Sequence, residues 1–491
     1  YHVAYDMQTP YRLCGGLQDN GTWCGPSQSP GAPGTPTSAW VNVGGGDGFS
    51  AVPDLSAPHL VYNNLQGGVI SLTDTRTGAS WGINPYPAGI GSSGQWMEPQ
   101  KYRFNWNAPI VLSPQDPKTV YYGGNVLFWT RNYGQSWDVI SPDVTTNDKS
   151  KQKSSGGPIV TDNTAAEFHC TIIAIGPSRV DPNVIWVGTD DGNVQVTRDG
   201  GKTWTNTFKD APGLAPFAWI STVDASPFDA GTAYVSASHW QDNDYAPYFY
   251  RTADFGKTWT KITTGLPARG WSHVIREDLR TKGLLYAGTE NGLYASWDDG
   301  ARWVSIRNNM PPVPVRDLVI HPRDNDIIVA THGRGLYILD DATALQGLGK
   351  AMKTEAYLFT ARPAVRWAAS SGMFRSNQRD WMAPNPPAGA YFDVYLRNST
   401  PEPVTITITD KAGKTVRVLR EPRAAAGVNR VVWNLRYDNP SAPRPAAPGP
   451  GMADVPPAIA ERFGGGNQGP MALPGEYGVK VKAGAQELTG T

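Results

Sequence analysis

A short turn motif recurs four times in the middle of the chain, and it restricts the folds that the chain can adopt. Its form is S/T-x-D/N-x-G-x-T/S/R-W, and we call it the tryptophan turn. In such a hairpin tip the Asp or Asn accepts hydrogen bonds from the turn's own amides, and the Gly takes a left-handed backbone. The Trp is then expected to pack between neighbouring sheets. The copies are Thr130–Trp137, Thr197–Trp204, Thr252–Trp259 and Ser296–Trp303, and a degraded fifth copy is Thr73–Trp81.

The spacing of these copies indicates a repeat architecture. They follow one another at intervals of about 45 to 65 residues, which is the period of propeller blades. Each repeat has a first strand, a second strand before a Gly turn, and a third strand that runs into the tryptophan turn. We therefore predict an all-β chain that begins with a seven-bladed β-propeller over residues 1–345. The seven first strands are expected to begin near His2, Asp47, Asn107, His169, Trp219, Ser272 and Val315.

The two ends of this predicted ring differ from its middle. The first repeat starts abruptly, and the seventh has no clear outer strand, so ring closure is expected to borrow a strand from the other end of the chain. The second strands carry the clearest signal. They are predicted at Tyr11–Gln18, His59–Leu65, Thr119–Gly124, Val184–Thr189, Thr232–Ala237, Leu284–Thr289 and Asp326–Thr331.

The composition changes beyond the last repeat. Residues 346–386 read as an irregular connector, with a short helix expected near Ala342–Met352. Residues 387–491 contain alternating strands and a hairpin turn at Asp410–Lys414, a pattern typical of a small immunoglobulin- or fibronectin-like β-sandwich. A Pro/Gly-rich insertion at 443–474 interrupts the sandwich.

The charge balance excludes some classes of partner. Lys plus Arg and Asp plus Glu both number 43, so the chain lacks the basic surface that nucleic acids require. No apolar run approaches the length of a membrane span. High Gly and Pro contents, 54 and 42 residues, suit a turn-rich extracellular protein. The chain opens on Tyr1 without a signal peptide, which suggests a processed form or a fragment.

Three cysteines leave at least one thiol unpaired: Cys14, Cys24 and Cys170. The dipeptide Asn20-Gly21 resembles a two-residue hairpin turn. That register sets Leu17, rather than Cys14, opposite Cys24. We therefore predict no disulfide between Cys14 and Cys24, and the cysteines alone do not fix the cellular compartment.

The tryptophan turn resembles the Asp-box, the repeat of bacterial neuraminidases, sortilins and xyloglucanases. Four other segments are distinctive, namely Tyr11–Gly21, Gly44–Phe49, Tyr102–Asn107 and Thr331–Gly335. With the terminal sandwich they resemble the large secreted bacterial proteins of the sortilin-like, neuraminidase-repeat glycosyl hydrolase family. The resemblance covers nearly the whole chain, but shared repeats are scaffold and do not establish function.

The resemblance also implies partners and a location. A further propeller normally precedes such a stretch in that family, so a preceding region of the same protein is an expected partner. The layout is similar to that of tandem-propeller xyloglucanases, whose substrate cleft lies between two propellers. A polysaccharide or oligosaccharide is the implied ligand, and secretion, the periplasm or the cell surface is the implied location.

Three carboxylates are candidates for glycoside hydrolysis, which needs two carboxyl groups across a sugar ring. Asp47 lies between glycines at the start of the first strand of the second repeat. Asp19 lies in the adjacent first repeat, and Glu98 lies in a long insertion between repeats. Each also has a simpler interpretation. Asp19 in Asp-Asn-Gly is a natural turn residue, Asp47 suits a turn equally well, and Glu98 before Pro99 can be an ordinary loop charge.

Aromatic and polar residues in the same class of loops are candidates for substrate binding, because flat rings stack on pyranoses. His332 can instead hydrogen-bond across the ring closure. His2, His169 and His273 all head first strands, where a polar channel lining is favoured over a metal site. The candidate substrate-binding residues are Trp96, Tyr102, Trp106, Trp219, Trp271, His273, His332 and Arg334.

Two functions remain open from the sequence. One is a secreted glycoside hydrolase that uses a carboxylate pair on the propeller's top face. The other is a non-catalytic, sortilin-like propeller that binds a peptide or a glycan. No arginine triad of the neuraminidase type stands out, and neither a cofactor nor a metal is predicted.

Overall fold

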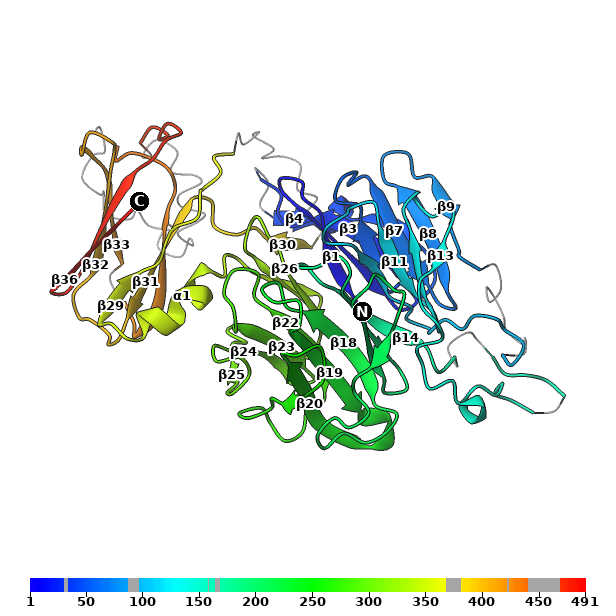
Figure 1. Ribbon diagram of the computed structural model, residues 1–491. Helices are drawn as coiled ribbons and strands as arrows, with labels where there is room; N and C mark the ends of the chain where they lie inside the picture. Colours follow the sequence, from blue (N-terminus) through cyan, green and yellow to red (C-terminus); the bar gives the residue numbers. More distant parts are fainter. Residues whose placement is uncertain are drawn as a thin grey trace. The chain divides into compact units, whose positions relative to one another are not determined.

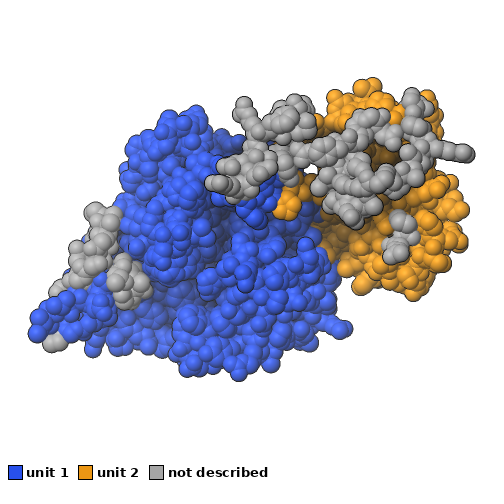
Figure 2. Space-filling view, turned by 180° about the vertical axis from the view of Figure 1, so that it is seen from behind, with its two compact units in different colours: residues 1–29, 34–340, 376–383 blue, residues 30–33, 341–375, 384–491 orange. Residues whose placement is uncertain are grey.

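The structure, a computed structural model, describes residues 1–30, 34–86, 97–157, 159–163, 168–367, 381–421, 424–439 and 469–491. Strands dominate, which confirms the all-β class. The α-helix of this part of the chain is α1 (Thr343–Ala351), where a helix was predicted, and no helix in it is long and apolar enough to cross a membrane. Two compact units are present (Figure 2), with unit 1 comprising residues 1–29, 34–340 and 376–383.

Unit 1 consists of antiparallel sheets that follow one another along the chain (Figure 1). Seven such sheets lie in the described residues 3–339, six with four strands and the last with three. The first three are β1 (Val3–Tyr5), β2 (Arg12–Leu17), β3 (Gly21–Pro26), β5 (Val41–Gly44); β6 (Ala51–Pro53), β7 (Leu60–Leu65), β8 (Val69–Asp74), β9 (Ser80–Gly82); and β10 (Ile110–Leu112), β11 (Val120–Gly123), β12 (Leu127–Thr130), β13 (Asp138–Val139).

The remaining four sheets repeat this order. They are β14 (Ile172–Pro177), β15 (Ile185–Thr189), β16 (Val194–Thr197), β17 (Thr205–Asn206); β18 (Trp219–Ala225), β19 (Ala233–His239), β20 (Asp244–Thr252), β21 (Thr260–Lys261); β22 (Ser272–Glu277), β23 (Leu285–Thr289), β24 (Gly292–Ser296), β25 (Val304–Ser305); and β26 (Val315–Ile320), β27 (Ile327–Thr331), β28 (Leu336–Leu339). A small extra sheet pairs β4 (Gly34–Pro36) with β30 (Met382–Pro384). Short 3-10 helices are η1 (Thr37–Ala39), η2 (Lys149–Lys151) and η3 (Trp240–Asp242).

The second strands β2, β7, β11, β15, β19, β23 and β27 confirm all seven second-strand predictions. Because strands alternate in direction within each sheet, two kinds of segment lie at one end, which we call the upper face. These are the segments that lead into first strands and the turns between second and third strands. The tryptophan turns join third to fourth strands and lie at the opposite end.

The tryptophan turns have the predicted geometry. In Thr252–Trp259 the threonine hydroxyl donates to Asp254 (2.8 Å), and Asp254 accepts from the amide of Thr258 (3.0 Å). The indole Nε1 of Trp259 then donates to the carbonyl of Thr207, which follows the last strand of the preceding sheet (2.9 Å). Trp137, Trp204 and Trp303 make the equivalent bond to the preceding sheet.

The degraded copy behaves differently from the sequence expectation. Asp74 accepts a hydrogen bond from the amide of Arg76 (2.9 Å) and pairs with its guanidinium, so the tip still forms a turn. Trp81, however, is 51% exposed instead of packing between sheets. A Cβ on Gly78 would meet no atom within 4 Å, whereas one on Gly300 would approach Ile262 of the preceding sheet to 2.6 Å. The degraded turn therefore lacks the close approach that seats the other tryptophans.

Contacts between first strands run around the whole unit. Each first strand contacts that of the next sheet, and β26 of the seventh sheet contacts β1 of the first. The expectation of a borrowed strand is wrong for the described residues, because β1 pairs within its own sheet and the seventh sheet has only its own three strands. The first and seventh sheets are instead joined by side chains. Tyr11 donates to Asp326 (2.9 Å), and the amide of Val3 donates to Asp317 (3.1 Å).

The prediction about the cysteines is also wrong, because Cys14 and Cys24 form a disulfide. The β2–β3 turn spans Gln18–Asn20, so Leu17 pairs with Gly21 and Cys14 lies opposite Cys24. Asp19 takes the left-handed backbone (φ 61°) that this three-residue turn needs. Cys170 is free and buried.

Unit 2 contains two antiparallel sheets in its described residues. The first is β29 (Ala356–Leu358), β31 (Ala390–Leu396) and β34 (Gly427–Trp433); the second is β33 (Thr415–Glu421), β32 (Val404–Thr409), β35 (Gly478–Ala483) and β36 (Gln486–Gly490). Buried residues of both, such as Val394, Ile406 and Val481, belong to one core cluster. Asp410 caps the predicted hairpin turn by accepting from the amide of Lys414 (2.9 Å). Residues 440–468, most of the predicted insertion, lie outside the described residues.

Candidate functional site

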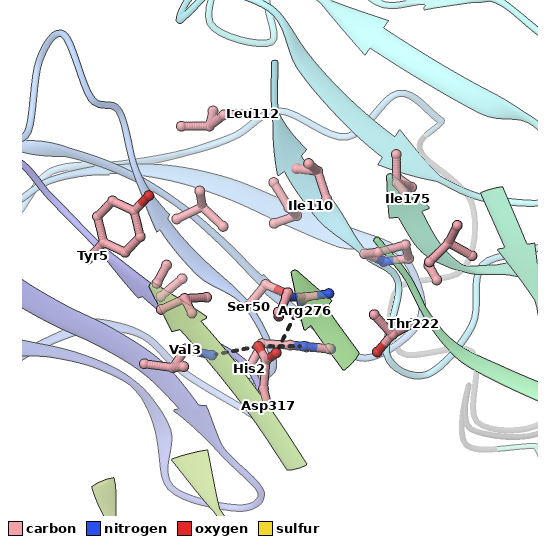
Figure 3. Close-up of a pocket in the computed structure, with 18 of the residues that line it drawn as sticks. His2, Val3, Tyr5, Ser50, Ile110, Leu112, Ile175, Thr222, Arg276 and Asp317 are labelled. Carbon is pink, nitrogen blue, oxygen red and sulfur yellow. Dashed lines mark hydrogen bonds and ion pairs between the residues drawn. The ribbon is translucent and has the colours of Figure 1, made fainter. Parts of the chain in front are cut away.

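The first strands of all seven sheets line one cavity of about 290 Å³, which we call the channel. Its wall is mostly apolar over the second to fourth sheets, apart from Arg179 after β14, and is charged over the sixth and seventh (Figure 3). Representative lining residues, in sheet order, are Val3, Ser50, Ile110, Ile175, Thr222, Arg276 and Asp317.

A hydrogen-bonded network crosses the charged side of the channel. Nδ1 of His2 lies 3.3 Å from Asp317, and its Nε2 lies 3.0 Å from the amide nitrogen of Asn107. Arg276 donates to the other oxygen of Asp317 at 3.2 Å (Figure 3). It also lies 3.8 Å from Asp224. The pKa of Asp317 is lowered: burial opposes this shift, and the contacts with His2 and Arg276 outweigh it. The network therefore joins five sheets, with the ionised carboxylate of Asp317 between His2 and Arg276.

A second cluster lies near the upper face and joins the sixth and seventh sheets. Nε2 of His273 lies 2.9 Å from the carboxylate of Glu290, and its Nδ1 lies 3.3 Å from Nη1 of Arg316. Because a guanidinium can only donate, Nδ1 is the acceptor and the proton sits on Nε2. Burial lowers the pKa of His273 to about 4, although Glu290 opposes this shift, so the ring is neutral at pH 7.

An aromatic patch adjoins this cluster on the same face. Trp240, in the turn between β19 and β20, stacks on Trp271 with ring centroids 6.0 Å apart and planes 22° apart. Tyr245 lies 5.6 Å from Trp271, and the Trp271 ring meets His273 edge-on at 5.9 Å. Trp240 is 41% exposed, so this stacked pair offers a flat apolar surface to solvent.

Two of the three predicted carboxylates come together. Asp47 accepts a hydrogen bond from the backbone amide of Asp19 (2.9 Å) and another from the indole of Trp106 (3.2 Å). Trp106 also packs against Phe49, with ring centroids 4.9 Å apart. Asp47 therefore has both oxygens engaged and joins loops of the first three sheets.

Glu98 is held by a different segment. It accepts from the amide and the hydroxyl of Ser154, at 2.9 and 2.6 Å. These bonds lower its pKa and keep the exposed carboxylate ionised at neutral pH. That state does not suit a general acid, which must carry a proton before reaction.

The other predicted binding residues are scattered. Tyr102 packs edge-on against Tyr86 and Phe128, at 5.3 and 5.0 Å, beside the core of the second and third sheets. Trp219 begins β18 and is half-buried, whereas His332 and Arg334 are exposed in the turn after β27. Trp96 lies outside the described residues.

The histidines that head first strands do not share a site. His2 contacts Asp317, His169 lies 3.4 Å from Asp190, and His273 contacts Glu290. Within the described part of the chain, no group of three metal-ligating side chains occurs. Each of these histidines is paired with a separate carboxylate.

Sequence reasoning missed the residues that the structure gathers around His273. Trp240 precedes Asp242-Asn243-Asp244 in a predicted upper turn, and Glu290 lies between Thr289 and Asn291 in another. The sequence is sufficient to place both residues in turns of the upper face. It does not predict that they lie close together, because this depends on how the fifth, sixth and seventh sheets pack beside one another.

Comparison with known proteins gives no family assignment. No family model matches the sequence. No curated protein matches it either. Among solved structures, the chain is similar to an ancestral GH74 enzyme, with a TM-score of 0.34 and 13% identity over 66% of this chain and 39% of that chain. It is also similar to YCF48 bound to D1 peptide, with a TM-score of 0.37 and 15% identity over 60% of this chain and 78% of that chain. The chain thus spans less than half of the GH74 enzyme, and likenesses this low say nothing about activity.

Proposed function

We propose that unit 1 is a seven-bladed β-propeller whose upper face binds a carbohydrate. The succession of seven meandering sheets and the contact between β1 and β26 support the propeller. The two sheets of unit 2, with their common core, support an immunoglobulin- or fibronectin-like sandwich that serves as an accessory module.

The aromatic patch carries the proposal of carbohydrate binding. Sugar rings present apolar C–H faces that pack on exposed aromatic rings, while their hydroxyl groups need nearby donors and acceptors. Trp240 stacked on Trp271 provides the flat surface. Glu290, which is bonded to His273 one ring further along, provides carboxylate oxygens as acceptors.

Replacing Trp240 by Ala is expected to weaken glycan binding by about 10-fold or more, because it removes a stacking surface worth one to a few kcal/mol. Trp240→Phe keeps a flat ring and is expected to retain most of the affinity. A glycan array followed by calorimetric titration of the best ligand measures both. Equal affinities of wild type and Trp240→Ala for every bound glycan would contradict this placement of the site.

Glycoside hydrolysis is the second candidate function, favoured by the meeting of Asp19 and Asp47. Retaining enzymes hold two carboxyl groups about 5 Å apart. The hydrogen bond from the Asp19 amide to Asp47 brings their loops together at the upper face. In this reading Asp47 is the nucleophile, oriented by Trp106, and the exposed Asp19 is the proton donor.

Asp47→Asn is expected to lower the rate of any glycan cleavage by about 100-fold or more, because the amide cannot act as nucleophile or base. Reducing-end release from a panel of polysaccharides measures this rate, with Glu98→Gln as the matched control expected to retain activity. Binding without release by the wild type would instead favour a non-catalytic, sortilin-like propeller that holds a glycan or a peptide.

We further propose that the protein works outside the cytoplasm, either secreted, periplasmic or on the cell surface. The disulfide between Cys14 and Cys24 supports an oxidising compartment. A preceding propeller of the same protein is proposed as a partner, and its presence would extend the upper face into a longer cleft.

A further inference from the structure

Arg316 and Arg276 both lie on first strands and line the channel, but their contacts differ. Arg316 lies on β26, and its Nη1 donates to Nδ1 of His273 (3.3 Å). Its Nε is buried without a hydrogen-bond partner, and no carboxylate of the described residues lies within ion-pair distance of it. Arg276, in the same cavity, pairs with Asp317 at 3.2 Å and approaches Asp224 at 3.8 Å. Arg316 is thus a half-buried cation with unused donors.

The charge of Arg316 is compensated only in part by its described neighbours. Glu290 attracts it through space, but the Glu290 carboxylate is hydrogen-bonded to His273. The intervening His273 is neutral at pH 7 and accepts one guanidinium proton. Desolvation lowers the pKa of Arg316 by more than the charge of Glu290 raises it. Such a cation is costly unless a ligand supplies the opposite charge.

We propose that Arg316 binds the carboxylate of an acidic sugar, so that the carbohydrate ligand is a uronate-containing glycan. The inference rests on the proposed carbohydrate-binding function and names its ligand class. A guanidinium presents paired N–H donors that match the two oxygens of a carboxylate. A neutral sugar offers neither the charge nor that geometry.

Arg316 lines the channel and lies close to the aromatic patch. Trp271 contacts His273, and His273 contacts Arg316, so the stacking surface and the cation are separated by one ring. The channel beyond is about 290 Å³ and carries the hydroxyl groups of Ser50 and Thr222. This volume is near the lower end of the range for small-ligand pockets, which suits one terminal sugar rather than a continuous chain.

The test compares each uronan with its own carboxyl-reduced form. Polygalacturonate, alginate and hyaluronan oligosaccharides are titrated into the full chain, each beside the matched neutral glycan in which the carboxylate has become CH₂OH. We expect at least one acidic form to bind the wild type about 10- to 100-fold more tightly than its reduced counterpart, the difference expected of one charge-assisted contact. Arg316→Gln is expected to abolish that preference, and Arg316→Lys to retain part of it.

Two controls separate this inference from the proposed function. Trp240→Ala is expected to weaken the acidic and the neutral forms by the same factor. Arg316→Gln removes a charge that has no ion pair, so its melting temperature is expected to be unchanged or higher. Arg276→Gln removes a partner of Asp317 and is expected to have a lower melting temperature.

Equal binding of acidic and neutral glycans, or an unchanged preference in Arg316→Gln, would overturn the uronate site alone. Binding of free-carboxyl peptides without any glycan would overturn both proposals.

Discussion

Replacing Trp303 by alanine is expected to lower the free energy of unfolding by about 3–5 kcal/mol, the usual cost of removing a large buried aromatic side chain. Trp303 is 2% exposed and packs against Phe249, with ring centroids 5.8 Å apart. Its indole donates to the carbonyl of Ile262 in the preceding sheet at 2.7 Å. The substitution therefore leaves a cavity between two sheets and a buried carbonyl without its donor.

Urea unfolding followed by far-ultraviolet circular dichroism measures this change, and Trp81→Ala is the matched control. Trp81 occupies the same place in the degraded turn but is 51% exposed, so its removal is expected to change stability by less than about 0.5 kcal/mol. Trp303→Phe, which keeps most of the packing and loses the hydrogen bond, is expected to fall between them. Similar losses for Trp303→Ala and Trp81→Ala would show that the bond between sheets is not what makes the tryptophan turn stabilising.

The contrast between Trp303 and Trp81 also shows which parts of the fold can be predicted from the sequence. A tryptophan turn can be predicted from the sequence because the hydroxyl, the carboxylate and the glycine that form it lie within eight residues. All four complete copies make the hydrogen bond to the preceding sheet. The disulfide was not readable. It depends on whether the β2–β3 turn has two residues or three, and the turn has three, with Asp19 and Gly21 both at positive φ.

The candidate site was harder to predict from the sequence than the fold, because its contacts join distant residues. The pairing of Asp47 with Trp106 and the pairing of His273 with Arg316 join residues 59 and 43 positions apart in different sheets. A sequence pattern assigns such residues to the upper face, but their neighbours depend on side-chain direction. Glu98 is an example: its insertion was a plausible place for a catalytic carboxylate, but its side chain accepts a hydrogen bond from Ser154.

The wild-type protein is expected to lose about 3 kcal/mol of stability between pH 7 and pH 4 through His273 alone. Its pKa falls from an ordinary 6.5 to about 4 in the folded state, because burial disfavours the charged ring. The unfolded chain therefore binds one proton more than the folded chain between these values. Stability from this source is full above about pH 6.5 and is lost as the pH falls towards 4. Urea unfolding at half-unit pH intervals measures the loss.

His273→Gln isolates this contribution, because glutamine can still donate to Glu290 but does not titrate. Burial also lowers the pKa of His321. For His169 burial acts the same way, but contacts with Asp190 outweigh it and raise the pKa, so only the difference between wild type and variant reports on His273. The carboxylates of the tryptophan turns, such as Asp199 and Asp254 with pKa values of about 2, titrate below this window. Protonation would also turn Nδ1 of His273 from an acceptor into a donor facing Nη1 of Arg316, setting two cations against each other. Parallel pH profiles for the two proteins would mean that His273 is not held neutral by its surroundings.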